Sequence, residues 1–260
     1  MFEFPLYIIG CFLFLIVTEK YRIATFGIAV IIAILYPFLA EVSEYSLFMR
    51  IKYCSVIFPV ILFSFAKCKS HYTGELFEKT FALMPTILRF VIVLNIAEAV
   101  VYVYLFDKFV TAFFGIILII TIPKFSYDEN QEIGFEDIWW VISYSMCLAI
   151  GLYFHPIESP LTSSGITILA VALLSCVYVK KWSKWLSFRV YSLYYLIIID
   201  ALLSRNGFLI YDWFYTESFS PENRITPALE NLFRVVSFVL CLILLYRWWN
   251  FRKLDYPKMI

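Results

Sequence analysis

Two polar residues, Asn95 and Glu98, lie near the middle of the otherwise apolar stretch "FVIVLNIAEAVVYVYL" (90–105). Residues three or four apart share one face of a helix, so these two side chains and Tyr102 would form one polar stripe. An ionised carboxylate that faces hydrocarbon is costly, and we therefore expect the stripe to face protein or water. Glu98 would then be either neutralised by desolvation or charged and paired with a cation. In either state it could bind a cation or carry a proton.

Lys52 is the partner that we expect for Glu98. The apolar segments 46–66 and 82–106 are consecutive, and both residues fall in the outer half of the membrane in the orientation derived below. The other residues assigned to the same pathway are Tyr144, Arg189 and Asp200. The secondary candidates, near the ends of apolar segments, are Glu19, His155 and Arg234. As an alternative, such side chains only join neighbouring helices, or reach the membrane surface from helix ends.

The sequence lacks the motifs of known enzyme classes. Its two histidines, His71 and His155, cannot form a histidine-rich metal site, and no H-E-x-x-H motif occurs. The segment "SSG" (163–165) lacks the G-x-S-x-G pattern of a nucleophilic serine. We therefore expect no metal and no cofactor, and an enzyme is the less favoured class. A membrane enzyme that uses Glu98 or Asp200 as a base stays open.

The composition indicates a membrane protein. Of the 260 residues, 62% are hydrophobic and 16% are charged, whereas a soluble domain is typically about a quarter charged. The mean hydropathy is +0.82. A spanning helix needs roughly 17 to 25 mostly apolar residues, which predicts an all-α, polytopic transmembrane helical bundle. The nine candidate spans are 4–18, 23–40, 46–66, 82–106, 109–123, 138–155, 165–180, 186–204 and 230–249.

The fifth segment, 109–123, is short and follows the fourth after only two residues. It either crosses the membrane or re-enters it, which gives nine or eight spans. With nine spans, thirteen of the 21 lysines and arginines fall on one side and six on the other. Because short cytoplasmic loops are enriched in these residues, the N-terminus is expected outside and the C-terminus in the cytoplasm. Residues 1–260 would form a single integral domain of the inner (plasma) membrane.

The stretch 205–230 is the longest polar connection. Its aromatic residues, among them Trp213 and Tyr215, are typical of a segment at the level of the lipid headgroups. It would act either as an interfacial anchor or as a lid over an external vestibule. The first residues lack a basic region, so no cleavable signal is predicted. A net charge of +1 without a basic, aromatic-rich patch argues against a nucleic-acid partner.

Several segments resemble a known family. They are "VTEKYR" (17–22), "IKYCS" (51–55), "LNIAEAV" (94–100), "GIILIITI" (115–122), "IWWVISYS" (138–145) and "WLSFRVYSL" (185–193). This pattern resembles an uncharacterised bacterial family of multi-span membrane proteins, classified only as a domain of unknown function. The chain departs from the pattern in its spacing around Cys54 and Ser55, and it lacks a later Trp–Asn pair. The resemblance implies no activity, but it implies a shared fold and a polar cluster of Glu19, Lys52, Asn95, Glu98, Tyr144 and Arg189.

These observations favour the transport or conduction of a small solute or ion through a site centred on Glu98. Two other classes stay open: a membrane-embedded enzyme acting on a lipid or small polar substrate, and a structural or regulatory subunit of a membrane complex. The expected partners are the lipid bilayer, the solute or ion, and either a second copy of the chain or another membrane protein.

Overall fold

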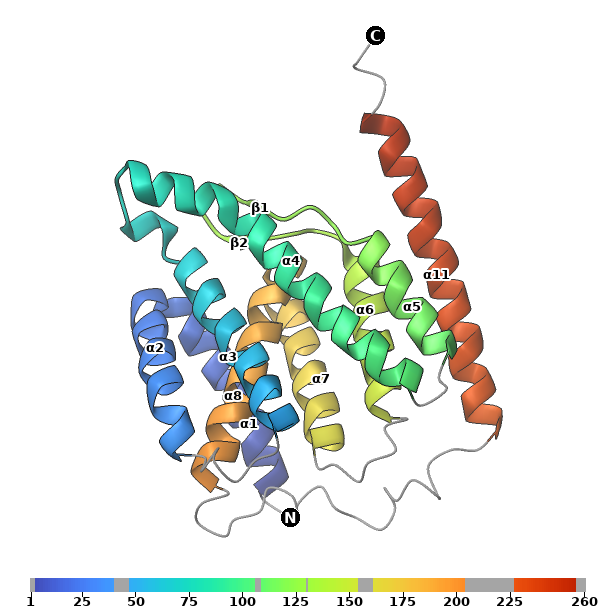
Figure 1. The fold of residues 1–260 in the computed structure, drawn as a ribbon, viewed down its shortest axis with the longest axis horizontal. Coiled ribbons are helices and arrows are strands. Elements are labelled where there is room, and N and C mark those ends of the chain that lie inside the picture. The colour runs from blue at the N-terminus through green and yellow to red at the C-terminus, as the bar shows by residue number, and fades with distance from the viewer. Residues whose placement is uncertain are drawn as a thin grey trace. The chain divides into compact units, whose positions relative to one another are not determined.

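The computed structural model describes residues 3–39, 47–105, 109–129, 131–153, 161–203 and 227–255 (Figure 1). These residues are mostly α-helical, which confirms the all-α class. Within them, each of the nine predicted apolar segments coincides with one α-helix. Two helices are clearly longer than predicted, since one begins at Glu75 rather than residue 82 and another ends at Asp255 rather than residue 249.

The described chain contains nine α-helices, two 3-10 turns and two short strands. The α-helices are α1 (Glu3–Lys20), α2 (Arg22–Leu39), α3 (Leu47–Ala66), α4 (Glu75–Leu105), α5 (Phe109–Ile120), α6 (Ile138–Tyr153), α7 (Leu161–Val179), α8 (Trp185–Leu203) and α11 (Pro227–Asp255). Two 3-10 turns, η2 (Lys69–His71) and η3 (Trp182–Lys184), follow α3 and α7. A small antiparallel hairpin, β1 (Ser126–Tyr127) and β2 (Ile133–Gly134), lies between α5 and α6, and the sequence pattern does not predict it.

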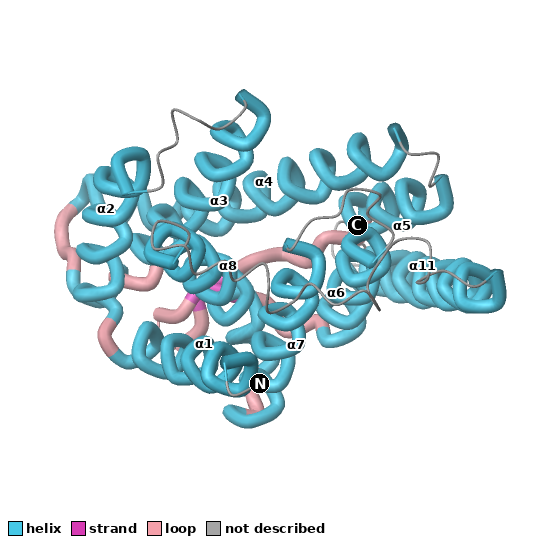
Figure 2. Tube along the Cα trace, turned by 90° about the horizontal axis from the view of Figure 1, so that it is seen from below, coloured by secondary structure: helices cyan, strands magenta, loops and turns pink. Residues whose placement is uncertain are grey.

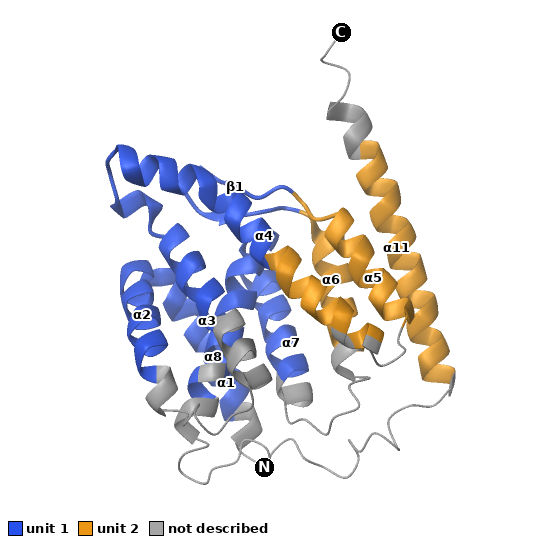
Figure 3. Ribbon diagram, in the orientation of Figure 1, with its two compact units in different colours: residues 1–91, 124–136, 160–216 blue, residues 92–123, 137–159, 217–260 orange. Residues whose placement is uncertain are grey.

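The chain forms two compact units, each built from three separate stretches (Figure 3). Unit 1 comprises residues 1–91, 124–136 and 160–216, and unit 2 comprises residues 92–123, 137–159 and 217–260. Helix α4 contributes its first part to unit 1 and its second part to unit 2. Because the stretches alternate along the chain, no single linker separates the units, and a single domain over residues 1–260 stays a prediction.

Helix α8 is the central helix of unit 1. It contacts α1, α2, α3 and α7, and Figure 2 shows α1 and α7 side by side. Trp185, Phe188 and Tyr191 of α8 are fully buried, as expected for a helix enclosed on all sides. The ring of Phe63 in α3 packs edge-on against Tyr191, with centroids 5.9 Å apart. The hydroxyl groups of Ser64 and Tyr191 share a hydrogen bond of 3.2 Å.

The hairpin packs against η3 and the start of α8. The rings of Phe125 and Phe135, which flank its two strands, stack with centroids 5.0 Å apart. At Gly134, an added Cβ would collide with the backbone carbonyl oxygen of Ser183 in η3. Glycine is therefore required at this position, because a larger residue would push β2 away from η3.

Helices α5, α6 and α11 pack against one another in unit 2. Asp137 caps α6, since its carboxylate accepts hydrogen bonds of 3.1 Å from the backbone N–H groups of Trp139 and Trp140. The indole N–H of Trp140 donates to the carbonyl oxygen of Leu118 in α5 at 3.1 Å. Arg247 of α11 donates to the Asp137 carboxylate at 3.4 Å. These bonds join the three helices at one level.

Two stretches of the described helices are long and apolar enough to cross a membrane, Glu75–Val101 and Ala228–Asn250. Shorter apolar stretches are Arg22–Leu35, Ile57–Ala66, Phe109–Ile120, Ile138–Ile150 and Gly165–Val179. The first two stretches qualify by length and apolar composition, and the core helix of a soluble protein can also have this length and composition. The count of nine spans therefore stays a prediction.

Candidate functional site

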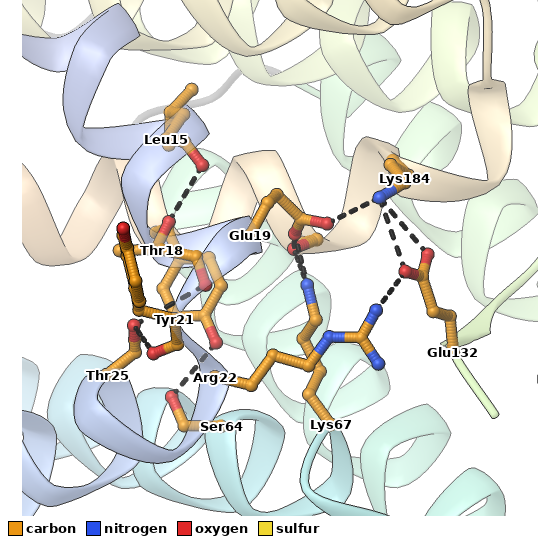
Figure 4. Close-up of polar contacts among 12 residues, drawn as sticks. Leu15, Thr18, Glu19, Tyr21, Arg22, Thr25, Ser64, Lys67, Glu132 and Lys184 are labelled. Carbon is orange, nitrogen blue, oxygen red and sulfur yellow. Dashed lines mark hydrogen bonds and ion pairs between the residues drawn. The ribbon is translucent and has the colours of Figure 1, made fainter. Parts of the chain in front are cut away.

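Five charged residues and one serine form an ion network at one end of unit 1 (Figure 4). Its members come from the end of α1, the start of α2, the residue after α3, the hairpin, η3 and the first turn of α8. Glu19 and Lys184, for example, are 165 residues apart in the sequence. The network consists of Glu19, Arg22, Lys67, Glu132, Lys184 and Ser187.

Glu19 is the centre of the network. Its Oε1 atom accepts hydrogen bonds from the ammonium group of Lys67 and the hydroxyl group of Ser187. Its Oε2 atom accepts a bond of 2.7 Å from Lys184. Lys67 also donates to the Oγ atom of Ser187 at 2.9 Å. The two oxygens of one carboxylate thus join α1 to the residue after α3, to η3 and to α8.

The outer part of the network is more accessible to solvent than the inner part. Lys184 also pairs with Glu132 at 3.2 Å, and Glu132 accepts a further bond from Arg22. The side chains of these three residues are 17% to 21% exposed, whereas that of Lys67 is 2% exposed. The pair of Lys67 with Glu19 is therefore shielded behind the outer pairs.

Burial and neighbouring charges shift the pKa values of Glu19, Lys67 and Lys184 in opposite directions, and these three groups lie outside the predicted spans. Burial raises the pKa of Glu19, but the ammonium groups of Lys67 and Lys184 outweigh it and lower that pKa to about 2. Burial lowers the pKa of Lys67 and outweighs the opposing effect of Glu19. At Lys184, burial is outweighed by the carboxylates of Glu19 and Glu132, which raise its pKa. Glu19 is thus ionised throughout the physiological range.

A tight corner between α1 and α2 places Glu19 and Arg22 at the same end of unit 1. Only Tyr21 separates the two helices, and the hydrogen bonds continue across it. The N–H of Tyr21 donates to the carbonyl oxygen of Val17 at 3.0 Å, and the N–H of Thr25 donates to that of Tyr21 at 2.8 Å. The hydroxyl group of Thr25 donates to the same Tyr21 carbonyl at 2.8 Å. This corner directs the side chains of Glu19 and Arg22 toward the other segments of the ion network.

The contacts of Ser187 do not favour a nucleophilic role. A catalytic serine needs a base that takes its proton, but Ser187 donates to Glu19, which is a weak base because of its low pKa. Lys67 acts as a donor toward Ser187. Among the described residues, no group of three or more His, Cys, Asp or Glu could hold a metal ion. The arrangement is that of an electrostatic junction of three cations and two carboxylates.

A second polar contact, in unit 2, involves the predicted pathway. The hydroxyl group of Tyr144 on α6 donates to the Oδ1 atom of Asn95 on α4 at 3.4 Å. The ring of Tyr144 also stacks on Trp140, with centroids 5.2 Å apart. Glu98, one turn further along α4, is half-buried. The structure thus brings Asn95 and Tyr144 together, and the face of α4 that carries Asn95 is directed toward α6.

The other predicted residues within the described side chains occupy different settings. Glu19 is the centre of the ion network, and Arg189 is buried in α8 of unit 1. Arg234 on α11 is 57% exposed and pairs at 2.8 Å with Glu230, one turn earlier on the same helix. This pair is typical of a helix surface.

Several predicted positions lie outside what the structure describes. The helices contain Lys52, Tyr102 and Asp200, but the side chains of these three residues are outside the described set, and so is the whole of His155. The pairing of Lys52 with Glu98 therefore stays a prediction.

Sequence reasoning missed most of the ion network. It counts Lys67 and Lys184 only among the thirteen basic residues on the side predicted to be cytoplasmic, and it assigns no role to Glu132. The available signal is Glu19, because an acidic residue at the end of an apolar helix is either solvated at the membrane surface or stabilised by a nearby counter-charge. Which of the cations near the helix ends supplies that charge depends on contacts between remote segments.

No family model matches the chain, and neither a curated protein nor a solved structure shows significant similarity to it. The resemblance described above therefore stays a prediction.

Proposed function

We propose that the chain is a multi-pass protein of the inner (plasma) membrane. Large apolar side chains point outward on its helices, and Leu13 of α1, Ile34 of α2 and Phe238 of α11 are each more than half exposed. Charged groups such as Lys67 and Arg189 are buried instead. Soluble monomers rarely expose large contiguous apolar faces, whereas lipid favours this distribution. The lengths of α1, α2, α3, α7 and α8, from 18 to 20 residues, suit a bilayer.

The ion network supports nine crossings rather than eight. Glu132 lies in the hairpin that follows α5, and it accepts a hydrogen bond from Arg22. Lys67, which follows α3, belongs to the same ion network, so both segments lie at one end of unit 1. Because the chain returns to the same end after α4 and α5, we infer that α5 crosses the membrane as α4 does. With 12 helical residues, α5 is about 18 Å long, and it needs a locally thin bilayer or help from its flanking residues. Nine crossings agree with an external N-terminus and a cytoplasmic C-terminus.

We propose further that the protein moves a small solute or ion along the polar stripe centred on Glu98. The observation that carries this proposal is the 3.4 Å hydrogen bond from Tyr144 to Asn95, which directs the stripe toward a neighbouring helix. Ionisable groups at such depth usually mark a pathway, because they are costly to retain otherwise. A carboxylate beside an amide and a phenol offers oxygen ligands to a cation, or a relay for a proton.

The proposal is tested by reconstituting the purified protein into liposomes and measuring the influx of protons, Na⁺ and K⁺. Glu98→Gln keeps the size of the side chain and removes its charge, so we expect it to lower the flux at least about tenfold, while insertion and purification are unchanged. The matched control is Glu75→Gln, which makes the same change at an exposed position in the first turn of the same helix.

Equal flux in the wild type and in Glu98→Gln would contradict the pathway. Tyr144→Phe removes only the hydroxyl group that binds Asn95, and we expect a smaller loss of flux from it. If Lys52 is the partner of Glu98, then combining Glu98→Lys with Lys52→Glu restores flux that either change alone removes.

A structural or regulatory subunit of a membrane complex is the second candidate. The ion network favours this candidate, because each of its five charged residues is paired within the network, as in a structural junction between helices. In that case the protein, extracted in mild detergent, would be purified together with another membrane protein, and the reconstituted chain alone would carry no flux.

A further inference from the structure

Three lysines lie at the same end of unit 1 as the ion network but outside it. Lys20 ends α1, and Lys180 and Lys181 follow α7; all three are exposed. Helices α1 and α7 pack side by side (Figure 2), and the pair of Lys184 with Glu19 ties the segment after α7 to the end of α1. Among the described residues, no ion pair involves any of the three. We propose that the seam between α1 and α7 binds an anionic phospholipid, with its phosphate at these lysines.

The surface next to the lysines suits an acyl chain. Leu13 and Val17 of α1 and Val177 of α7 are each more than half exposed. Tyr178 is 70% exposed, and its ring packs edge-on against Phe12 of α1, with centroids 5.3 Å apart. Tyrosine prefers the boundary between headgroups and hydrocarbon. Along the seam, the lysines are followed by Tyr178 and then by exposed apolar side chains. A phospholipid has its parts in the same order, with the phosphate first, then the headgroup boundary and then the acyl chains.

The backbone at Lys180 is a second, independent observation. Helix α7 ends in a Schellman motif, in which the N–H of Lys180 donates to the carbonyl oxygen of Val177 and the N–H of Lys181 donates to that of Cys176, both at 3.2 Å. Lys180 occupies the left-handed position of this motif, with φ of 55°. Glycine is strongly preferred there, because a side chain is sterically disfavoured. A lysine is therefore unexpected at this position, and a role of its positive charge in binding the phosphate would explain it.

An anionic lipid is the occupant that matches this charge. In the proposed orientation these lysines face the cytoplasmic leaflet, which carries anionic lipids and attracts basic residues at its surface. Each lysine near such a surface strengthens binding by about fivefold. The inference rests on the proposal that unit 1 crosses the membrane, but it does not depend on transport.

The test uses the purified full-length protein in micelles of short-chain phosphatidylcholine, titrated with phosphatidylglycerol, and counts the retained lipids by native mass spectrometry. We expect the wild type to retain phosphatidylglycerol in preference to phosphatidylcholine. Lys180→Gly with Lys181→Gln should lower the affinity for phosphatidylglycerol about 30-fold and leave that for phosphatidylcholine unchanged. The matched control is Lys79→Gln with Lys124→Gln, which removes two exposed positive charges elsewhere in unit 1.

The same titration separates the outcomes. Equal affinity for phosphatidylglycerol in the wild type and the double variant overturns the site. If inorganic phosphate displaces the bound lipid at equal concentration, the site takes a free anion and the commitment to a lipid is overturned. Folding is checked by the melting temperature in phosphatidylcholine alone, which Lys180→Gly should leave unchanged or raise, and a marked fall would overturn the role given to the left-handed position. Because the readout needs no flux, a failure of transport leaves it unaffected.

Discussion

Glu19 and Lys67 form the most deeply buried ion pair of the network. The attraction within such a pair offsets the loss of hydration only while both partners are present, so the removal of one leaves an uncompensated buried charge. The hydrogen bonds from Ser187 and Lys184 supply the further partners that a buried carboxylate requires. The pair is therefore expected to stabilise the junction of the helices.

We expect Glu19→Gln to lower the free energy of unfolding by about 3 kcal/mol, because Lys67 then stays buried without its carboxylate. The double variant Glu19→Gln with Lys67→Met removes both charges and should recover part of this loss. The free energies are measured by denaturation in detergent. The exposed variant Glu75→Gln should change the value by less than about 1 kcal/mol, and an equally small effect of Glu19→Gln would contradict the stabilising role.

The stability of the protein should also depend on pH through Glu19. Its pKa is lowered from 4.5 to about 2 in the folded protein, so the unfolded chain binds the proton more readily. The stabilisation from Glu19 is then complete above pH of about 4.5 and is lost as the pH falls toward about 2. Melting temperatures recorded across this range should fall more steeply for the wild type than for Glu19→Gln. Parallel curves would show that Glu19 does not titrate in this way.

At the scale of the elements, the hairpin and the corner of α1 with α2 position the network. The hairpin carries Glu132 to Lys184, and this approach depends on the close contact of β2 with η3 at Gly134. The corner depends on continuous hydrogen bonding through Tyr21. The position of the hairpin has no strong sequence pattern, because it depends on the remote backbone of Ser183 in η3.

Two glycine substitutions in unit 1 should have opposite effects. Gly134→Ala places a methyl group against the backbone carbonyl of Ser183, so we expect a loss of about 1 to 3 kcal/mol in the free energy of unfolding. Gly27→Ala lies inside α2, where an added Cβ meets no atom within 4 Å, and it should stabilise the helix by about 0.5 to 1 kcal/mol. The same denaturation assay measures both. A neutral Gly134→Ala would show that the approach of β2 to η3 is not tight.

At the scale of the whole molecule, the nine crossings that we propose would place the hairpin in the cytoplasm and the connection 204–226 outside. This can be tested in a variant whose six native cysteines are replaced. A cysteine at Glu129, in the hairpin, should react with a membrane-impermeant reagent only after the cells are opened. A cysteine at Glu222 should react in intact cells. Labelling of both positions from the same side would contradict the proposed orientation.

The sequence by itself determined where the helices lie. Long apolar runs such as 46–66 and 186–204 coincide with α3 and α8. Such a run favours a helix by its own length and composition, which can be read from the local sequence. The periodicity also placed Asn95 and Glu98 on one face of α4. The hairpin was not predicted, since two-residue strands leave no pattern.

Only the tertiary structure decided which charges meet. The sequence marks Glu19 as an acidic residue at a helix end. Lys67 and Lys184 reach Glu19, and Glu132 reaches Lys184, only through the packing of segments that are far apart in the chain. Ion pairing depends on distances of a few ångströms, and such distances are set by the packing of α8 with its neighbours. Local composition carries no information about that packing, which is why the network emerged from the structure alone.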